Sequence, residues 1–128
     1  MLLMRILVIA NLFFFPSLAN CGEEKTGNDL FQGCISIIKV SEGERVSDDD
    51  SISAIAWAGY LSGFADSYSI TSKVEGRRTT LFCYPPQGIG SVQAARIIAK
   101  FLRENPLELH QSARVCALHA LSEVFPCR

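Results

Sequence analysis

The chain has 128 residues, which is enough for one domain and too few for two of ordinary size. Its 12 basic and 13 acidic residues give a net charge of −1. Binding to nucleic acid depends mainly on basic contacts to phosphate, so this balance argues against a nucleic-acid partner.

Residues 1–19 have the three-part pattern of a secretory signal peptide. Arg5 supplies the positive charge, residues 6–15 are an almost unbroken apolar run, and Ala19 is a small residue at a cleavage position. A membrane-spanning helix would need about 20 apolar residues, whereas Pro16 ends this run early. We therefore expect export and cleavage after Ala19.

A second processing route involves Cys21. Residues 18–21, Leu-Ala-Asn-Cys, resemble a lipobox, in which Cys21 would be lipidated and become the mature N-terminus. Asn20 departs from the small residue usually found before that cysteine. A single acyl chain holds a protein only weakly at a membrane, so such anchors carry several. Lipidation of Cys21 stays an open alternative.

The first predicted helix runs from about Asn28, a favoured N-cap residue, to about Val40. Its apolar side chains recur at helical spacing: Leu30, Cys34, Ile37 and Ile38. Residues 41–50 form a polar, acidic loop that ends in three consecutive aspartates. They lack the spacing and glycine of a calcium-binding loop, and negative charge suits a helix start. We interpret them as the beginning of the next helix.

The second predicted helix runs from about Ser51 to about Thr71, and we expect it to be the central helix. Its apolar and small residues form a wide stripe: Ile52, Ile55, Ala56, Gly59, Tyr60, Gly63 and Phe64. Each glycine inside a helix costs about 1 kcal/mol relative to alanine. Their place on the stripe predicts close approach of another helix backbone. Trp57 and Leu61 make the neighbouring face apolar as well.

Residues 72–90 are predicted to be a long connection with a brief extended segment at 79–82. Pro85 and Pro86 disfavour helix at the residues before them. A connection of this length needs a tether or a function. A disulfide at Cys83 would supply the tether.

Two further amphipathic helices follow. One is predicted from about Ser91 to Asn105, with an inner face of Val92, Ala95, Ile98, Ala99 and Leu102. The other is predicted from about His110 to Phe125, with an inner face of Ala113, Cys116, Ala117, Ala120, Leu121 and Val124. Residues 20–128 are therefore predicted to form an all-α, single-domain bundle of about four helices with a long tethered loop.

The chain contains five cysteines, and export would place them in an oxidising compartment. We favour a Cys83–Cys127 disulfide, because one partner lies in a loop and the other near the C-terminus. Closing this loop of about 45 residues would stabilise the fold by about 4 kcal/mol. Cys34 and Cys116 both fall on apolar helix faces, where they either pair or remain buried thiols. Both alternatives stay open.

No arrangement of residues predicts catalysis or metal binding. No cysteine pair has CxxC spacing, and His110 and His119 stand at no ligand spacing with a cysteine. Cys116 and His119 are three residues apart on one helix, as a nucleophile and its base would be. The central place of Cys116 on the apolar stripe favours a structural role instead. We expect no enzyme activity and no cofactor.

Five short motifs, each present once, are distributed along nearly the whole exported chain. In chain order they are Gly27-Asn28-Asp29-Leu30 with Cys34, Gly59-Tyr60-x-x-Gly63, Cys83-x-Pro85, Phe101-Leu102-x-x-x-Pro106 and Phe125-Pro126-Cys127. This series resembles the Rap/Tai family of immunity proteins. Family members often carry a cysteine two residues before the first glycine of the second motif, where this chain has Trp57. A partner for Cys34 is then missing, and Cys116 is the candidate substitute.

The resemblance implies an exported, helical, disulfide-linked protein. Characterised members bind a papain-like amidase toxin of type VI secretion in the periplasm, often as dimers, and occlude the active site that cuts peptidoglycan. A cognate amidase toxin is therefore the expected partner, with a homodimer as a further expectation. The alternative is an envelope lipoprotein or structural adaptor with another partner, which acylation of Cys21 would favour.

The candidate contact residues lie in the exposed connections. Three segments qualify: the acidic loop 42–50, the charged segment 73–78 and the turn 105–111. The residues chosen from the first and third are Glu42, Glu44, Asp48, Asp49, Asp50, Glu108 and His110. An acidic loop would suit a basic toxin groove and speed encounter. The alternative for each segment is an ordinary solvated loop.

Overall fold

The computed structural model describes residues 23–75 and 81–127. Within these ranges the chain forms α2 (Gly27–Ser41), α3 (Asp48–Glu75), α4 (Ser91–Glu104), the short 3-10 helix η2 (Pro106–His110) and α5 (Ala113–Val124). The predicted all-α class, with four helices and a disulfide-tethered loop, is confirmed. The signal peptide, Cys21 and part of the expected 79–82 segment lie outside the described residues.

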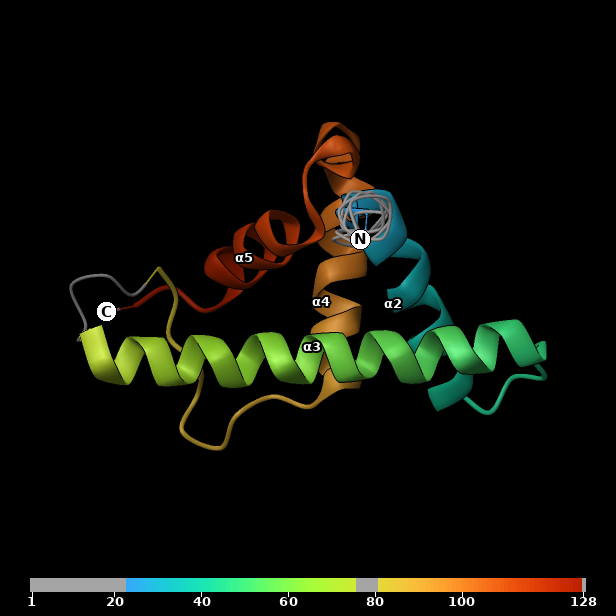
Figure 1. Cartoon of the computed structure of the whole chain (residues 1–128), viewed down its shortest axis with the longest axis horizontal. Helices are drawn as coiled ribbons and strands as arrows, with labels where there is room; N and C mark the ends of the chain where they lie inside the picture. Colours follow the sequence, from blue (N-terminus) through green and yellow to red (C-terminus); the bar gives the residue numbers. More distant parts are fainter. Residues whose placement is uncertain (1–22, 76–80, 128) are drawn as a thin grey trace, which may run out of the picture.

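The helix α3 lies along one side of the molecule, and the other helices rise from it (Figure 1). Helix α2 packs against both α3 and α4, while α5 packs against α4. The core between them is built from side chains such as Leu30, Cys34, Ile98, Leu102 and Cys116, which are fully buried. The expectation that the second helix is central is therefore wrong, because α2 and α4 occupy that place.

A capping box begins α2. The backbone N–H of Thr26 donates to Asp29 Oδ2 at 2.8 Å, and Thr26 Oγ1 accepts from the Asp29 N–H at 3.3 Å. The helix thus begins two residues earlier than the expected N-cap at Asn28. Both groups that the box satisfies would otherwise lack a helical partner. The hydrogen bonds from Thr26 also lower the pKa of Asp29.

Helix α3 is longer than predicted. Its 28 residues extend about 42 Å at the usual rise per residue. The aspartates 48–50 form its first turn, as the sequence analysis expected. Ser47 Oγ accepts from the Asp50 N–H at 3.1 Å and satisfies one donor of that turn.

The face that α3 turns toward the bundle is not the predicted one. Ala54 and Leu61 are buried, and the half-buried side chains that pack with them include Trp57 and Phe64. The expected stripe turns outward at most of its positions, so that Ile52 and Ile55 are 66% and 75% exposed. Both faces are apolar, and aromatic side chains gain the most from burial. The face with Trp57 is therefore the one that is covered.

The close helix approach predicted at Gly59 and Gly63 is also absent there. A Cβ atom added at either glycine would meet nothing within 4 Å. The close approach occurs instead at Gly33 of α2, where a Cβ would overlap the ring of Trp57. Two helices do meet through a glycine, on the opposite side of α3.

The two C-terminal helices bury most of the predicted faces. Four of the five predicted inner residues of α4 are buried: Ala95, Ile98, Ala99 and Leu102. The predicted inner residues of α5 are also buried from Ala113 to Leu121. Val92 is half-buried, and Val124 is 50% exposed. The predicted start of the last helix at His110 is wrong. Pro106 begins a 3-10 turn that ends at His110, and α5 begins after Ser112.

The Cys83–Cys127 disulfide ties the long connection to the C-terminus, with an S–S length of 2.07 Å. The Cys83 N–H donates to the Phe125 carbonyl at 2.8 Å beside it. Cys34 and Cys116 are buried free thiols. Of the two alternatives for these cysteines, the structure therefore shows the unpaired one.

The aromatic ring of Tyr68 on α3 stacks on buried Phe82 of the connection, with 4.0 Å between ring centroids. The Tyr68 hydroxyl accepts from the N–H groups of Leu81 and Phe82 at 2.7 and 2.9 Å, and it contacts the Phe82 carbonyl oxygen at 3.1 Å, to which it donates. One side chain therefore satisfies the backbone of the connection where it crosses α3. Across the described ranges no helix is long and apolar enough to pass through a membrane.

Candidate functional site

The turn formed by η2 stands at the end of the bundle away from α3, at the top of Figure 1. Leu107 lies in this turn and is 85% exposed, the highest value among the large apolar side chains that the structure describes as exposed. Glu104, Asn105 and His110 around it are exposed as well. The turn therefore presents one apolar side chain within a polar surround.

Backbone hydrogen bonds fix this turn to the start of α2. The Gly27 N–H donates to the Gln111 carbonyl at 2.7 Å, and the Ala113 N–H donates to the Lys25 carbonyl at 2.7 Å. A Cβ at Gly27 would lie 2.7 Å from both Cys116 Sγ and the Glu108 carbonyl oxygen, so only glycine fits. The turn is thus held on a rigid support.

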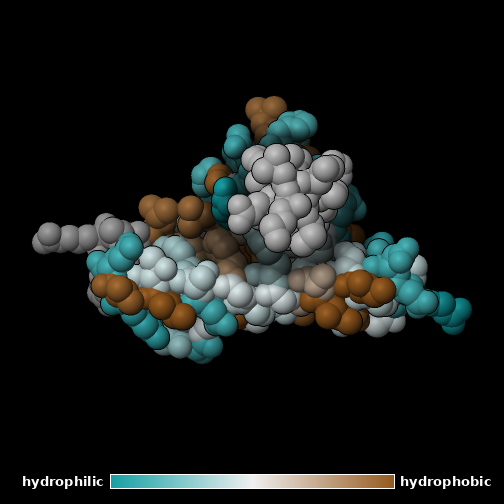
Figure 2. All heavy atoms as spheres, viewed as in Figure 1, coloured by the Kyte–Doolittle hydropathy of each residue, from teal (hydrophilic) through white to brown (hydrophobic). Residues whose placement is uncertain are grey.

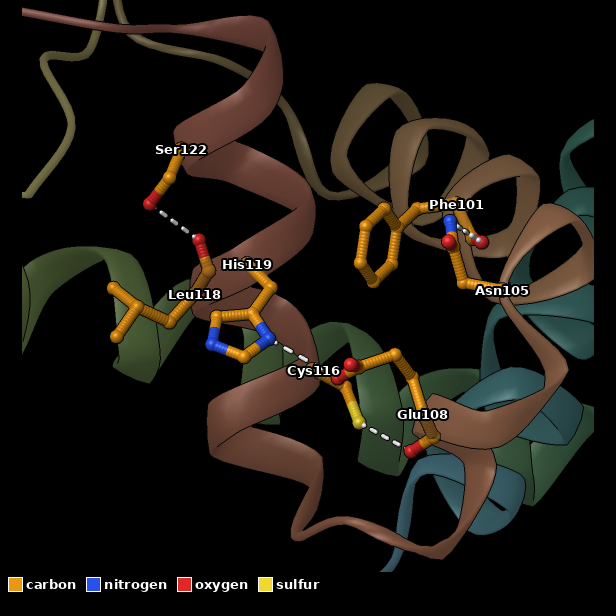
Figure 3. Close-up of polar contacts among 7 residues, drawn as sticks. All are labelled: Phe101, Asn105, Glu108, Cys116, Leu118, His119 and Ser122. Carbon is orange, nitrogen blue, oxygen red and sulfur yellow. Dashed lines mark hydrogen bonds and ion pairs between the residues drawn. The ribbon is translucent and has the colours of Figure 1, made fainter.

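Two side chains of α5 hold the turn from its other side (Figure 3). Cys116 Sγ donates to the Glu108 carbonyl oxygen at 3.1 Å, and His119 Nδ1 lies 3.0 Å from Glu108 Oε2. Both partners belong to the same residue of η2. Glu108, one of the predicted contact residues, is half-buried and positions the turn.

The contacts of Cys116 and His119 do not support their action as a catalytic nucleophile and its base. Each of these side chains interacts with Glu108. Burial and the nearby Glu108 carboxylate raise the pKa of the Cys116 thiol. A thiol with a raised pKa is a poor nucleophile, because the thiolate is the reactive form. The geometry favours a structural role for both residues.

The acidic candidates before and at the start of α3 form a separate surface. Glu42, Glu44, Asp48 and Asp49 are exposed. Asp50 is half-buried, and its Oδ1 accepts from Ser36 Oγ of α2 at 3.3 Å. We therefore assign Asp50 to the packing of α2 on α3. Glu42 forms an ion pair with Arg96 of α4, in which Arg96 Nη2 donates to Glu42 Oε1 at 3.2 Å. Glu44, Asp48 and Asp49 are left as the exposed acidic surface.

The structure does not bring the predicted contact residues together. Glu42 follows the C-terminal end of α2, whereas η2, with Glu108 and His110, is bonded to its N-terminal end. The 15 residues of α2 span about 22 Å. Lys73 lies in the last turn of α3, and residues 76–78 lie outside the described part. Among the described residues, no group of three or more histidine, cysteine, aspartate or glutamate side chains is placed to hold a metal ion.

The turn 105–111 is one of the predicted contact segments, but Leu107, its most exposed apolar side chain, is not among the predicted contact residues. The sequence contains a signal for this exposure. Leu107 directly follows Pro106 in a polar turn, so it belongs to no apolar helix face that could be buried. The periodicity of a helix does not extend across such a turn.

These features define a class of protein: a small helical bundle, tethered by a disulfide, that presents a rigid protruding turn. Residues 26–127 match the family model of the Rap1a immunity proteins, and the chain belongs to this family. No curated protein and no solved structure gave a match. Membership implies binding to a cognate toxin, and this family is not typically enzymatic.

Proposed function

We propose that this chain is a periplasmic immunity protein that binds and blocks a peptidoglycan amidase toxin delivered by type VI secretion. The signal-peptide pattern of residues 1–19 supports export, and the Cys83–Cys127 disulfide suits an oxidising compartment. Membership of the immunity family supports toxin binding without catalysis. Self-association as a homodimer is part of this proposal.

The observation that carries the proposal is the exposed Leu107 on its fixed turn. Interfaces depend on a few anchor side chains that become fully desolvated, and an apolar side chain at a protruding tip is suited to enter a concave site. Because the turn is already held by hydrogen bonds to α2 and α5, little conformational entropy would be lost on binding.

The experiment expresses each candidate amidase toxin in the periplasm with and without this chain. We expect the cognate toxin to lyse cells only when the chain is absent. Equal lysis in both cases, for every neighbouring toxin, would remove the proposal.

The anchor role is tested with Leu107→Ser and with a matched control, Val40→Ser. Val40 is also apolar and exposed, but it lies near the C-terminal end of α2, away from η2. We expect Leu107→Ser to weaken toxin binding by about tenfold or more, as loss of an interface anchor does. Val40→Ser should bind as the unaltered chain does. Equal binding by both variants would exclude the turn as the contact.

A further inference from the structure

The second half of α3 and the connection that follows it enclose an open groove. In Figure 1 the connection crosses α3 and loops past it before α4 begins. Two cavities of about 250 and 420 Å³ lie between the helix and residues 82–89. Four residues line both cavities and join them into one groove: Ser69, Tyr84, Pro85 and Pro86. The larger cavity alone reaches the usual size of a small-ligand site, and we call the whole the Tyr84 groove.

The wall that the connection supplies is fixed in the absence of a ligand. The Tyr68 hydroxyl accepts from the Phe82 N–H at 2.9 Å, and the disulfide begins at the next residue, Cys83. The Gly88 N–H donates to the Pro85 carbonyl at 2.8 Å and closes the turn that follows. Little conformational entropy of the protein would therefore be lost when a ligand binds.

One charged side chain of each sign lines the groove. Asp66 lines the smaller cavity and Lys73 the larger one. They are seven residues apart on α3, which is nearly two full turns, so they share one face and stand about 10 Å apart along the helix axis. Both are exposed, and neither forms an ion pair with another described residue. The groove thus offers a negative group at one end and a positive group at the other.

Between these charges the groove offers apolar surface and two hydroxyl groups. Pro85 and Pro86 have no N–H to donate, and the Pro85 carbonyl already accepts the hydrogen bond that closes the turn. Within residues 23–75 and 81–127 the hydroxyls of Ser69 and Tyr84 form no hydrogen bond. Burial and nearby Tyr68 raise the pKa of Tyr84 to about 12, so its hydroxyl stays protonated and can donate. The groove suits a ligand with charged ends and a largely apolar middle.

Two other classes of ligand fit this surface less well. A saccharide carries hydroxyl groups along its whole length, and each one needs a polar partner when it is buried. The ring of Tyr84 is half-buried and contacts Phe82 edge to face, with 4.8 Å between ring centroids. A polyanion would meet the carboxylate of Asp66 at one end of the groove. The observations therefore favour a ligand that carries one charge of each sign.

We propose that the Tyr84 groove binds a short, extended peptide with free ends, whose ammonium group lies at Asp66 and whose carboxylate lies at Lys73. An extended chain spans at most about 3.3–3.6 Å per residue, so three or four residues bridge the two charges. The prolines contact its side chains, and the free hydroxyls bind its backbone. This inference goes beyond the proposed function, because η2 stands at the end of the bundle away from α3.

The first test titrates the purified, isotope-labelled exported chain with trialanine and follows the backbone amides by NMR. We expect saturable shifts centred on Asp66, Ser69 and Tyr84. Dialanine spans only about 7 Å and should bind more weakly. The absence of saturable shifts at millimolar trialanine would overturn the inference. Tighter binding of an uncharged trisaccharide of N-acetylglucosamine at the same amides would overturn it as well.

The second test pairs each charge of the peptide with its partner in the groove. Amidation of the trialanine carboxylate should weaken binding to the unaltered chain about two- to fivefold, as expected for an exposed charge pair. It should not affect binding to Lys73→Gln, which has already lost the pair. Acetylation of the ammonium group should likewise weaken binding to the unaltered chain and leave Asp66→Asn unaffected. Full sensitivity of either variant to its matching change would contradict the proposed placement of the ends.

Two control variants separate the groove from its surroundings. Lys100→Gln removes an exposed lysine of α4 that does not line the groove, and it should bind as the unaltered chain does. An apolar patch also lies near the end of α3 on its outward face (Figure 2). It contains Ile70 and Val74, which are 62% and 80% exposed and do not line the groove. Ile70→Ser should therefore bind normally, and loss of binding in this variant would place the peptide on the patch instead.

A last comparison distinguishes free peptides from segments of a larger protein. A peptide with blocked ends that carries its charges on a lysine and an aspartate side chain, three residues apart, represents such a segment. We expect it to bind more weakly than trialanine, because its long side chains lose rotamer freedom on binding. Tighter binding of the blocked peptide would overturn the proposal in favour of a protein partner. No measurement here uses the toxin, so failure of this inference and failure of the proposed function are distinguishable.

Discussion

The indole ring of Trp57 on α3 occupies the space in which a side chain at position 33 of α2 would stand. Gly33 directly precedes Cys34, which is fully buried. In this chain the contact between the two helices at that point is made by an aromatic ring on a glycine, and Cys34 remains a free thiol.

The first prediction concerns this contact. Gly33→Ala would place a methyl group inside the Trp57 ring and force α2 and α3 apart. We expect the free energy of unfolding, measured in urea, to fall by about 1–3 kcal/mol, as overpacking of a core does. Gly63→Ala is the matched control: it adds the same methyl group to a helix where space is open, and it should raise stability by about 0.5–1 kcal/mol. If Gly33→Ala were as stable as the unaltered chain, the Trp57 ring would be able to move away from position 33 at little cost, and the prediction would be wrong.

The sequence predicted the helices well where one face alone is apolar. The stripes of α2, α4 and α5 identify most of the core, because periodicity reports burial directly when the opposite face is polar. The Cys83–Cys127 disulfide was also predictable, since a loop cysteine and a terminal cysteine can both adjust to bridge geometry.

Periodicity could not decide which face of α3 is buried. Residues on both sides of this helix are apolar, so the regular spacing from Ile52 to Phe64 fits an inner face as well as an exposed one. The aromatic side chains decide the orientation only when their partners in other elements are known, such as Gly33 for Trp57 and Phe82 for Tyr68. The position of η2 could not be predicted from local sequence either, because it depends on backbone hydrogen bonds to Lys25 and Gly27, which are distant along the chain.

The second prediction concerns the hydroxyl of Tyr68. Tyr68→Phe removes the acceptor for the Leu81 and Phe82 N–H groups and leaves the Phe82 carbonyl without this donor. We expect the free energy of unfolding to fall by about 1 kcal/mol, because the part-buried Phe82 N–H and carbonyl lose their partner, whereas the exposed Leu81 N–H can bond to water. Hydrogen exchange at the Phe82 amide should become faster. Tyr84→Phe removes a hydroxyl from the same aromatic cluster without touching these bonds, and its effect on that exchange should be small. An unchanged exchange rate in Tyr68→Phe would contradict the prediction.

The third prediction concerns the disulfide. Replacing Cys83 and Cys127 together by serine frees a loop closed over a sequence separation of 44 residues. The unfolded chain gains entropy, so we expect the free energy of unfolding to fall by about 4 kcal/mol. Adding reductant to the unaltered chain should lower stability by a similar amount and should leave the double variant unchanged. A further loss in the variant would mean that reductant acts elsewhere.

The fourth prediction concerns Cys34 and pH. Burial raises the pKa of this thiol from 9.0 to about 12, so the folded chain keeps it neutral where the unfolded chain ionises it. Its contribution to stability is therefore complete below about pH 9 and is lost as the pH rises toward 12.

Urea unfolding at several pH values checks this. Cys34→Ala should reduce the slope of stability against pH above pH 9, whatever its effect on stability at pH 7. Tyr84, whose pKa burial also raises to about 12, supplies the control, because Tyr84→Phe should reduce the slope only above the ordinary tyrosine value of 10.0. In the folded chain at pH 8 a thiol reagent should not modify Cys34, and denaturant should make it react. Rapid modification without denaturant would show that Cys34 is accessible, and the slope in Cys34→Ala would then match that of the unaltered chain.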